Sequence, residues 1–170
     1  MTKPRVGVAD TGVVSLGAVV QYVGEVLGRA HSPDRPDWRI LSVQGTALDQ
    51  LGRHAEAQQY YASALRLMPD EPSVLSNLGL SYALSKNLPQ AESTLRRAAQ
   101  QRPADPKIRQ NLALVVGLQG RFTEAEAIVR ADLSPDEAAQ NVVYLRKMLA
   151  QQQNEMKKNG RPGPALTPSS

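Results

Sequence analysis

Few residues in this chain have a type and spacing that could do chemistry. The two histidines, His31 and His54, lie far apart in the sequence, and neither has an acidic residue or a cysteine at metal-ligand spacing. Glu124 and Glu126 are separated by a single residue, so on a helix they point to different faces and cannot share acid–base work. G-x-G-x-x-G, P-loop and G-x-S-x-G motifs are absent from the sequence. We therefore predict a protein that is not an enzyme and takes no cofactor or metal, with His54 at the surface.

Composition narrows the class of protein further. The 170 residues include no cysteine, which excludes disulfides, thiolate metal sites and cysteine nucleophiles. The formal charge of +4 is concentrated near the end of the sequence, at Lys157, Lys158 and Arg161. Aromatic residues make up only 4% of the chain, so a basic stripe with base-stacking aromatics is not predicted and we expect no nucleic-acid partner.

No apolar run approaches the roughly 18 residues that a membrane span needs. The apolar stretch from Val13 to Val20 follows two basic residues, as in a signal peptide, but no A-x-A cleavage site comes after it. We interpret this stretch as part of a loosely amphipathic lead-in helix.

The main feature of the chain is a pattern that returns at a fixed period. We number the units from Trp38, Pro72 and Pro106, which each take position 1. Positions 8 and 20 hold small residues, whereas positions 4, 7, 11 and 24 are mostly large and apolar. The small residues are Gly45, Gly79 and Ala113 at position 8 and Ala57, Ala91 and Ala125 at position 20. Two antiparallel helices can approach closely only where such small side chains meet, so each unit predicts a helix pair.

This pattern resembles the tetratricopeptide repeat (TPR), a helix–turn–helix of about 34 residues. The first unit departs from the family's signature only at Gln44, and the second matches it throughout. The third departs at Arg109, Asp132 and Glu137. The resemblance implies an all-α fold, a right-handed solenoid of three helix pairs with a C-terminal capping helix. A generic helical bundle is the alternative, but it would not keep small and large residues at one fixed period.

The helix boundaries follow from local signals. We expect helices at 38–51, 54–67, 72–85, 89–101, 106–119 and 122–131. Gly52 and Gly120 at position 15 are predicted to turn the chain within units one and three, and Asn87 to do so in unit two. Ser134, Pro135 and Glu137 form a capping box that begins a further helix, which we expect to close the array with one apolar and one polar face.

The chain is divided accordingly. The expected segments are a frayed start at 1–15, a lead-in helix and loop at 16–37 that is a remnant of a preceding repeat, three repeats at 38–133 (38–71, 72–105 and 106–133), a capping helix at 134–155 and a disordered tail at 156–170.

The function that this architecture offers is a groove along the first helices of the units. Positions 2, 5, 6, 9, 12 and 13 of those helices are expected to line its concave side. The candidate groove residues are Arg39, Ser42, Thr46, Ser73, Asn77, Leu80, Lys107, Asn111 and Leu114. Asn77 and Asn111 both hold position 6, where a free amide could pair with the main chain of an extended peptide. The alternative is that these are ordinary solvated side chains.

A carboxylate clamp of the chaperone-adaptor TPR kind is not predicted. Asn77 and Lys107 match two of its positions, but Ser42 and Thr46 stand where Lys and Asn are required, and Asn111 replaces a cation. A peptide carboxylate would therefore be left with too few charged partners.

Beyond the generic repeat, several stretches of the amino-acid sequence resemble the C-terminal part of the TadD family. TadD is the TPR protein of the tight-adherence (Flp-type) pilus assembly system of bacteria. The similar stretches lie between about residues 27 and 150 and include "RAHSPDRPDWRILSVQG", "LDQLGRHAEAQQYY", "DEPSVLSNLGLSYALSKNLPQAE", "RQNLALVVGLQGRFTEAE" and "NVVYLRKML".

The TadD resemblance implies a non-enzymatic accessory protein on the periplasmic side, with a protein or peptide partner such as a secretin or another pilus component. Such proteins usually begin with a lipoprotein signal and its cysteine, which this sequence lacks. A cytoplasmic TPR adaptor unrelated to secretion is the alternative.

Overall fold

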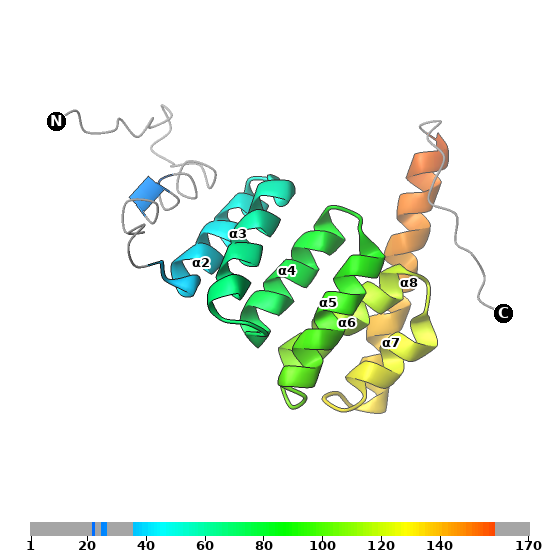
Figure 1. Ribbon diagram of the computed structural model, residues 1–170. Coiled ribbons are helices and arrows are strands. Elements are labelled where there is room, and N and C mark those ends of the chain that lie inside the picture. The colour runs from blue at the N-terminus through cyan, green and yellow to red at the C-terminus, as the bar shows by residue number, and fades with distance from the viewer. Residues whose placement is uncertain (1–21, 23–24, 27–35, 159–170) are drawn as a thin grey trace, which may run out of the picture.

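The computed structural model describes Tyr22, residues 25–26 and residues 36–158, and all regular structure in this part of the chain is helical. Figure 1 shows the helices stacked pair by pair along one axis, followed by a long single helix. Their bounds are α2 Trp38–Gln50, α3 His54–Leu67, α4 Pro72–Leu84, α5 Leu88–Gln101, α6 Pro106–Leu118, α7 Phe122–Val129 and α8 Pro135–Lys158. The predicted solenoid of three helix pairs with a C-terminal helix is confirmed.

The first helix of each pair begins in the same way. An acidic residue stands just before it and accepts a hydrogen bond from the backbone N–H two residues on, which satisfies one of the free donors of the first turn. These capping residues are Asp37, Glu71 and Asp105. α8 begins with the predicted capping box: the Ser134 N–H donates to Glu137 Oε2 at 2.9 Å, and the Glu137 N–H donates to Ser134 Oγ at 3.3 Å.

Position 15 turns the chain between the two helices of every unit. Gly52 and Gly120 adopt φ angles of 74° and 83° there, as predicted. In unit two the prediction was wrong, because Lys86 takes the left-handed conformation, with φ 65°. Asn87 instead acts as the N-cap of α5, and its side-chain oxygen accepts a hydrogen bond from the Gln90 N–H at 3.4 Å.

The close approach within each pair lies where the small residues were predicted. A Cβ added at Gly45 would lie 2.7 Å from Tyr61 Cε1, and one added at Gly79 would lie 2.6 Å from Leu95 Cγ. The core continues from unit to unit rather than forming one centre. Val74 of α4, for example, packs into the cluster of α2 and α3 that contains Tyr61.

α8 extends further than predicted. It reaches Lys158, so residues 156–158 belong to a helix and not to a tail. The good helix formers of this stretch and the two lysines in its last turn favour that continuation. At 24 residues α8 is about 36 Å long, against roughly 20 Å for the 13-residue α6. The predictions for residues 1–15, for most of 16–37 and for 159–170 fall outside the described residues.

Among the described residues, no helix has the length and apolar character that crossing a membrane requires.

Candidate protein-binding face and the contacts that position it

The nine predicted groove residues all lie on the first helices of the three units, α2, α4 and α6. Four of them are buried or half-buried and the rest are exposed. Ser42 is buried, Asn77, Leu80 and Asn111 are half-buried, and Arg39, Thr46, Ser73, Lys107 and Leu114 are exposed.

The two asparagines at position 6 connect neighbouring units. Asn111 Nδ2 donates to Ser76 Oγ at 3.0 Å, and Asn77 Nδ2 donates to Ser42 Oγ at 3.5 Å. Each bond joins one first helix to the first helix before it. We expected both amides to face solvent without a partner, and that expectation was wrong. One N–H of each amide is already bonded within the solenoid, so a peptide could use only the second N–H and the carbonyl oxygen of each side chain.

The residues at position 2 belong to the helix starts. The backbone N–H groups of Arg39, Ser73 and Lys107 donate to the capping carboxylates that precede them. The Arg39 guanidinium also stacks over the Trp38 ring, 4.8 Å from its centroid. The Lys107 side chain is exposed on α6.

A polar cluster that the sequence did not reveal lies between units one and two. Asp49 accepts hydrogen bonds from His54 Nδ1 at 2.8 Å, from Ser81 Oγ at 2.8 Å and from the Tyr61 hydroxyl at 3.1 Å. The Asp49 side chain is only 10% exposed. The prediction that His54 has no acidic partner was therefore wrong. The partner stands earlier in the chain, across the turn, and periodicity alone could not indicate that the two side chains meet.

The order of the groups in this cluster matters for chemistry. In a serine–histidine–aspartate triad the imidazole lies between the hydroxyl and the carboxylate. Here the carboxylate of Asp49 lies between Ser81 and His54, and both bond to the same oxygen, Oδ1. Burial raises the pKa of the Tyr61 phenol, which donates its single proton to Asp49 and lies 3.2 Å from the Thr46 hydroxyl, so it is not poised to lose that proton. The cluster is arranged to hold two units together.

Units two and three are joined by a charged network around Glu92. Its Oε2 accepts from Arg121 at 2.7 Å and from Gln119 at 2.8 Å, while Oε1 accepts from Arg96 at 2.7 Å. Burial opposes ionisation of Glu92, but these hydrogen bonds outweigh it and hold the pKa of this carboxyl below its usual range.

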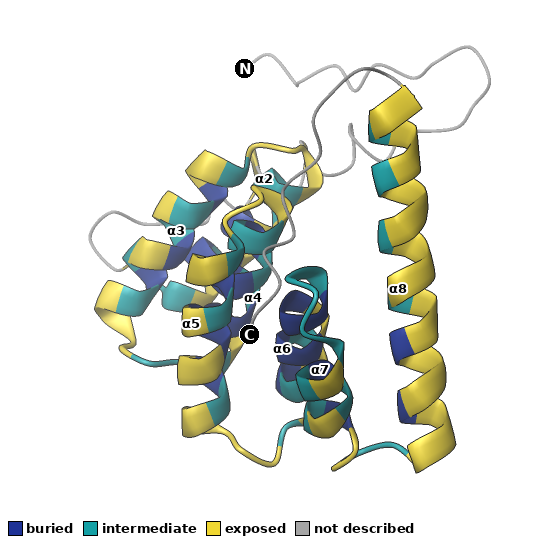
Figure 2. Ribbon diagram, turned by 90° about the vertical axis from the view of Figure 1, so that its right-hand side faces the viewer, coloured by how far each residue is buried: buried dark blue, intermediate teal, exposed yellow. Residues whose placement is uncertain are grey.

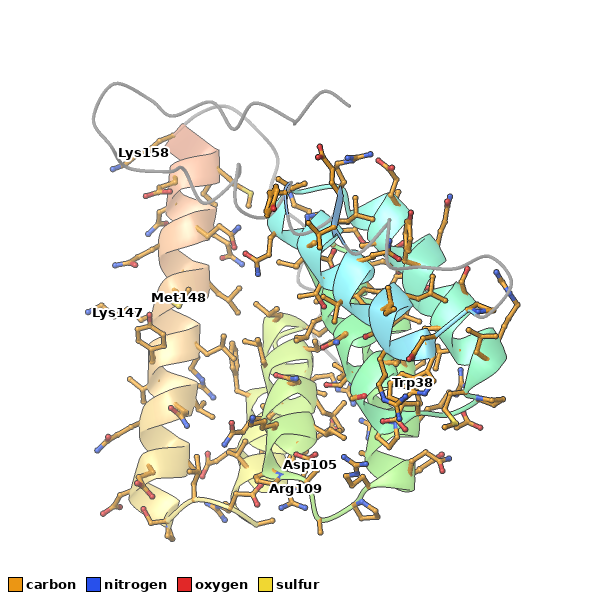
Figure 3. The ribbon with its side chains drawn as sticks, turned by 90° about the vertical axis from the view of Figure 1, so that its left-hand side faces the viewer. Trp38, Asp105, Arg109, Lys147, Met148 and Lys158 are labelled. Carbon is orange, nitrogen blue, oxygen red and sulfur yellow. The ribbon has the colours of Figure 1, made fainter. Side chains whose placement is uncertain are left out.

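The departures from the repeat pattern at Arg109 and Asp132 compensate each other. These positions, 4 and 27, hold Leu75 and Ala98 in unit two, where the two side chains share one buried cluster. In unit three Arg109 Nε donates to Asp132 Oδ2 at 2.7 Å, and a second guanidinium nitrogen bonds the other oxygen. An apolar contact is thus replaced by a bidentate ion pair. Figure 3 shows Arg109 close to Asp105 at the N-terminal end of α6.

α8 continues the repeat at a spacing shortened by about one helical turn. Positions 3 and 7 of successive first helices are buried against the preceding unit, and α8 supplies the next member of each series. The series are Val74, Ile108 and Ala138 at position 3 and Leu78, Leu112 and Val142 at position 7. The shortening matches the second helix of unit three, because α7 has 8 residues whereas α3 and α5 have 14 each. α8 therefore packs in the register of the first helices of the preceding units.

This register extends the concave face onto α8. Positions 9 and 13 form two rows of large apolar side chains on three neighbouring helices, namely Leu80, Leu114 and Tyr144 in one row and Leu84, Leu118 and Met148 in the other. Tyr144 is 66% exposed and Leu84 58%. The expected polar outer face of the capping helix is thus only partly present. The sequence prediction missed Tyr144 and Met148 because it kept the period of the first three units, and the signal was the return of the position 6 asparagine as Asn141 at the shortened spacing.

This surface contains a trough of about 450 Å³ between α6 and α8. Leu114 and Leu118 form one wall, and Tyr144, Met148 and Leu149 belong to the other. Figure 2 shows that the buried residues of α8 lie toward α6 and α7, in its N-terminal half, and that most of its remaining surface is exposed.

Within the described residues, no group of three or more histidine, aspartate or glutamate side chains is placed to hold a metal ion. Three of the nine predicted groove residues, namely Leu80, Leu114 and Lys107, leave side chains on this face without a bond inside the described part of the chain, and only Leu114 lines the trough.

Comparison with known proteins identifies the family of this chain. The family model described as Tetratricopeptide repeat matches residues 42–106 and 87–138, which together span more than half of the chain. The chain therefore belongs to the tetratricopeptide repeat family. No curated protein sequence matches it.

Several solved structures share the fold. "MamA MSR-1" has a TM-score of 0.61 at 19% identity, covering 84% of this chain and 89% of its own. "MamA AMB-1" has a TM-score of 0.60 at 20% identity, covering 82% of both chains. The Sgt2 TPR domain from Aspergillus fumigatus has a TM-score of 0.55 at 19% identity, covering 82% of this chain and 92% of its own. At these identities the likeness describes the fold alone.

Proposed function

We propose that this protein is a non-enzymatic scaffold that binds another protein through its concave face, and that it serves the assembly of a tight-adherence pilus. The observation that supports binding is the pair of apolar rows at positions 9 and 13, which remain exposed or half-exposed on α4, α6 and α8. A continuous apolar surface of this kind on a soluble protein typically marks an interaction site. TPR domains in general bind protein partners.

The pilus role is supported by the resemblance of the amino-acid sequence to TadD. Under this proposal the partner is a secretin or another component of the assembly machinery, on the periplasmic side. A cytoplasmic adaptor with the same binding face is the competing proposal.

The test is capture of the purified pilus secretin and its neighbouring components on the immobilised protein. The Leu80→Glu, Leu114→Glu double variant places two charges on the apolar rows and should reduce capture by about tenfold or more. Gln100→Glu on α5 adds a charge to an exposed residue outside the rows and should leave capture unchanged. Equal capture by the two variants would contradict the concave face, and no capture by the parent would contradict the pilus role.

The Asn77→Ala, Asn111→Ala double variant separates recognition from architecture. Each substitution removes a hydrogen bond between units, which should lower the free energy of unfolding by about 0.5–1.5 kcal/mol per site. Capture by the folded variant at low temperature should stay close to that of the parent. A loss of capture without a loss of stability would restore the direct peptide contact predicted from the sequence.

A further inference from the structure

The trough between α6 and α8 has a chemical character that restricts what can fill it. None of its thirteen lining residues carries a charge. The polar groups among them are the side-chain amides of Gln110, Asn141 and Gln152 and the hydroxyl of Tyr144. A partner segment must therefore present an uncharged and mainly apolar surface, because a charge placed here would be desolvated without an opposite charge to pair with.

The backbone of the partner is restricted as well. An extended segment exposes one N–H and one C=O per residue, and each must find a hydrogen-bond partner when it is buried. The trough offers only the four polar side chains named above, so a strand lying in it would leave several backbone groups unsatisfied. A helix bonds its own backbone internally and can enter an apolar trough at no such cost.

The walls have the spacing that suits a third helix. Leu114 and Leu118 lie one turn apart on α6, and the lining residues of α8 run from Asn141 to Gln152, over about 16 Å of helix. A helix laid between two others contacts each through residues three and four apart. Three to four turns of an added helix would span this length.

α8 provides a seam that continues past α6. Val142, Leu145, Leu149, Gln152 and Met156 recur at alternating spacings of three and four, the pattern of a helix–helix contact. Val142 is buried and Leu145 lies against Gly117 of α6. α8 itself extends beyond the end of α6 (Figures 2 and 3). The seam there has no neighbour among the described helices.

The charged residues at this end of α8 indicate which charge the partner should carry beside them. Its last turn carries Lys157 and Lys158, with Glu155 as the acidic residue beside them, whereas Arg146 stacks over the Phe122 ring of α7. Figure 3 shows Lys147 pointing away from α6 and Lys158 at the helix end. Acidic residues on the flank of an incoming helix, outside its apolar stripe, would face this positive end favourably.

We propose that the trough between α6 and α8 binds an amphipathic α-helix of a partner protein, with an uncharged apolar stripe against the trough and acidic residues on its flank near the end of α8. This inference rests on the proposed function and specifies the form of the ligand. α8 is then a wall of the binding site as well as the end of the solenoid.

The probe is a fluorescently labelled peptide of about five helical turns, built from leucine, alanine, glutamine and glutamate. Its leucines stand at i, i+3, i+4 and i+7 over two heptads, and its glutamates lie on the flanks. One control has the same composition in an order that spreads the leucines around the helix. A second control has one central alanine replaced by proline, which breaks a helix but is tolerated in an extended segment. A third replaces the glutamates with lysines.

Fluorescence anisotropy with the full chain should show saturable binding of the first peptide. The scrambled and proline peptides should bind at least about tenfold more weakly, and the lysine peptide several-fold more weakly at low salt. Equal binding of the proline peptide would overturn the helical ligand, and equal binding of the scrambled peptide would overturn the apolar stripe. Equal binding of the lysine peptide would overturn the acidic flank.

Two variants of α8 locate the site. Met148 lines the trough and is 48% exposed, whereas Val143 is 64% exposed and does not line it. Met148→Glu should weaken binding of the first peptide by about tenfold or more, and Val143→Glu by less than about twofold. Because both side chains are exposed, both variants should keep the circular dichroism of the parent. Equal weakening by the two variants would overturn the assignment to the trough.

The result is separable from the proposed function. If the secretin is captured through the apolar rows but no helical peptide binds, the scaffold role stands and the helical ligand is wrong. If the peptide binds and the pilus components do not, the trough is a helix-binding site and the pilus role is wrong.

Discussion

At position 15 every unit requires the same left-handed backbone conformation, and the sequence supplies it in two ways. Gly52 and Gly120 adopt it without steric cost, because glycine has no Cβ. Lys86 adopts it with φ 65° in unit two. For a residue with a side chain this conformation costs about 1 kcal/mol. At position 15, unit two therefore carries a local strain that units one and three avoid with glycine.

We expect Lys86→Gly to stabilise the protein. Relief of the strain at Lys86 should raise the free energy of unfolding by roughly 0.5–1 kcal/mol, after allowance for the greater freedom of glycine in the unfolded chain. Chemical denaturation by urea measures this change. Asn87→Ala is the matched control at the next residue, and loss of the N-cap of α5 should lower stability by about 1 kcal/mol. A destabilised Lys86→Gly variant would show that the lysine is not strained.

At the scale of the helix pair, the residues at positions 8 and 24 have reciprocal sizes. The glycines Gly45 and Gly79 face the large side chains of Tyr61 and Leu95. In unit three the larger Ala113 occurs with the smaller Val129, and both are buried in one cluster. The distance between paired helices is thus kept by exchanging volume from one helix to the other.

This exchange predicts a rescue. Gly79→Ala places a methyl group 2.6 Å from Leu95 Cγ and 3.3 Å from the Ala91 carbonyl oxygen, and the overpacking should cost about 1–3 kcal/mol. Gly79→Ala, Leu95→Val recreates the combination found in unit three and should recover part of that loss. Leu95→Val alone should destabilise, since it leaves a cavity. Thermal melts of the four proteins complete the cycle, and strictly additive losses would contradict the volume exchange.

The helix pairs were predictable from the sequence because they depend on a single period. Gly79, Ala91 and the two glycines at position 15 each have one physical role that the residue type alone indicates. The features that were missed depend on contacts between residues whose spacing does not follow the repeat. Asp49 meets Ser81 of the next unit through side-chain length and direction. Tyr144 joined the binding face only because the spacing shortened before α8.

The whole molecule is a linear array, in which each unit is stabilised by its own packing and by its contact with the next. The contact between units one and two contains the buried carboxylate of Asp49, with donors from both units. The contact between units two and three contains the Glu92 network instead. A substitution that breaks one of these contacts should therefore destabilise mainly the end of the array that the contact holds to the rest.

We expect Asp49→Ala to loosen one end of the molecule selectively. It leaves the hydroxyls of Tyr61 and Ser81 without their shared acceptor, and because Tyr61 is almost fully buried the loss should be about 2 kcal/mol or more. Hydrogen–deuterium exchange should rise across α2 and α3, while α5, α6 and α7 keep the protection of the parent. Asp49→Asn retains one acceptor oxygen and should show a smaller rise in the same helices. A uniform loss of protection from α2 to α7 would mean that the array unfolds as a single cooperative block. Unchanged exchange in α2 and α3 would mean that the Asp49 cluster does not hold the first unit to the second.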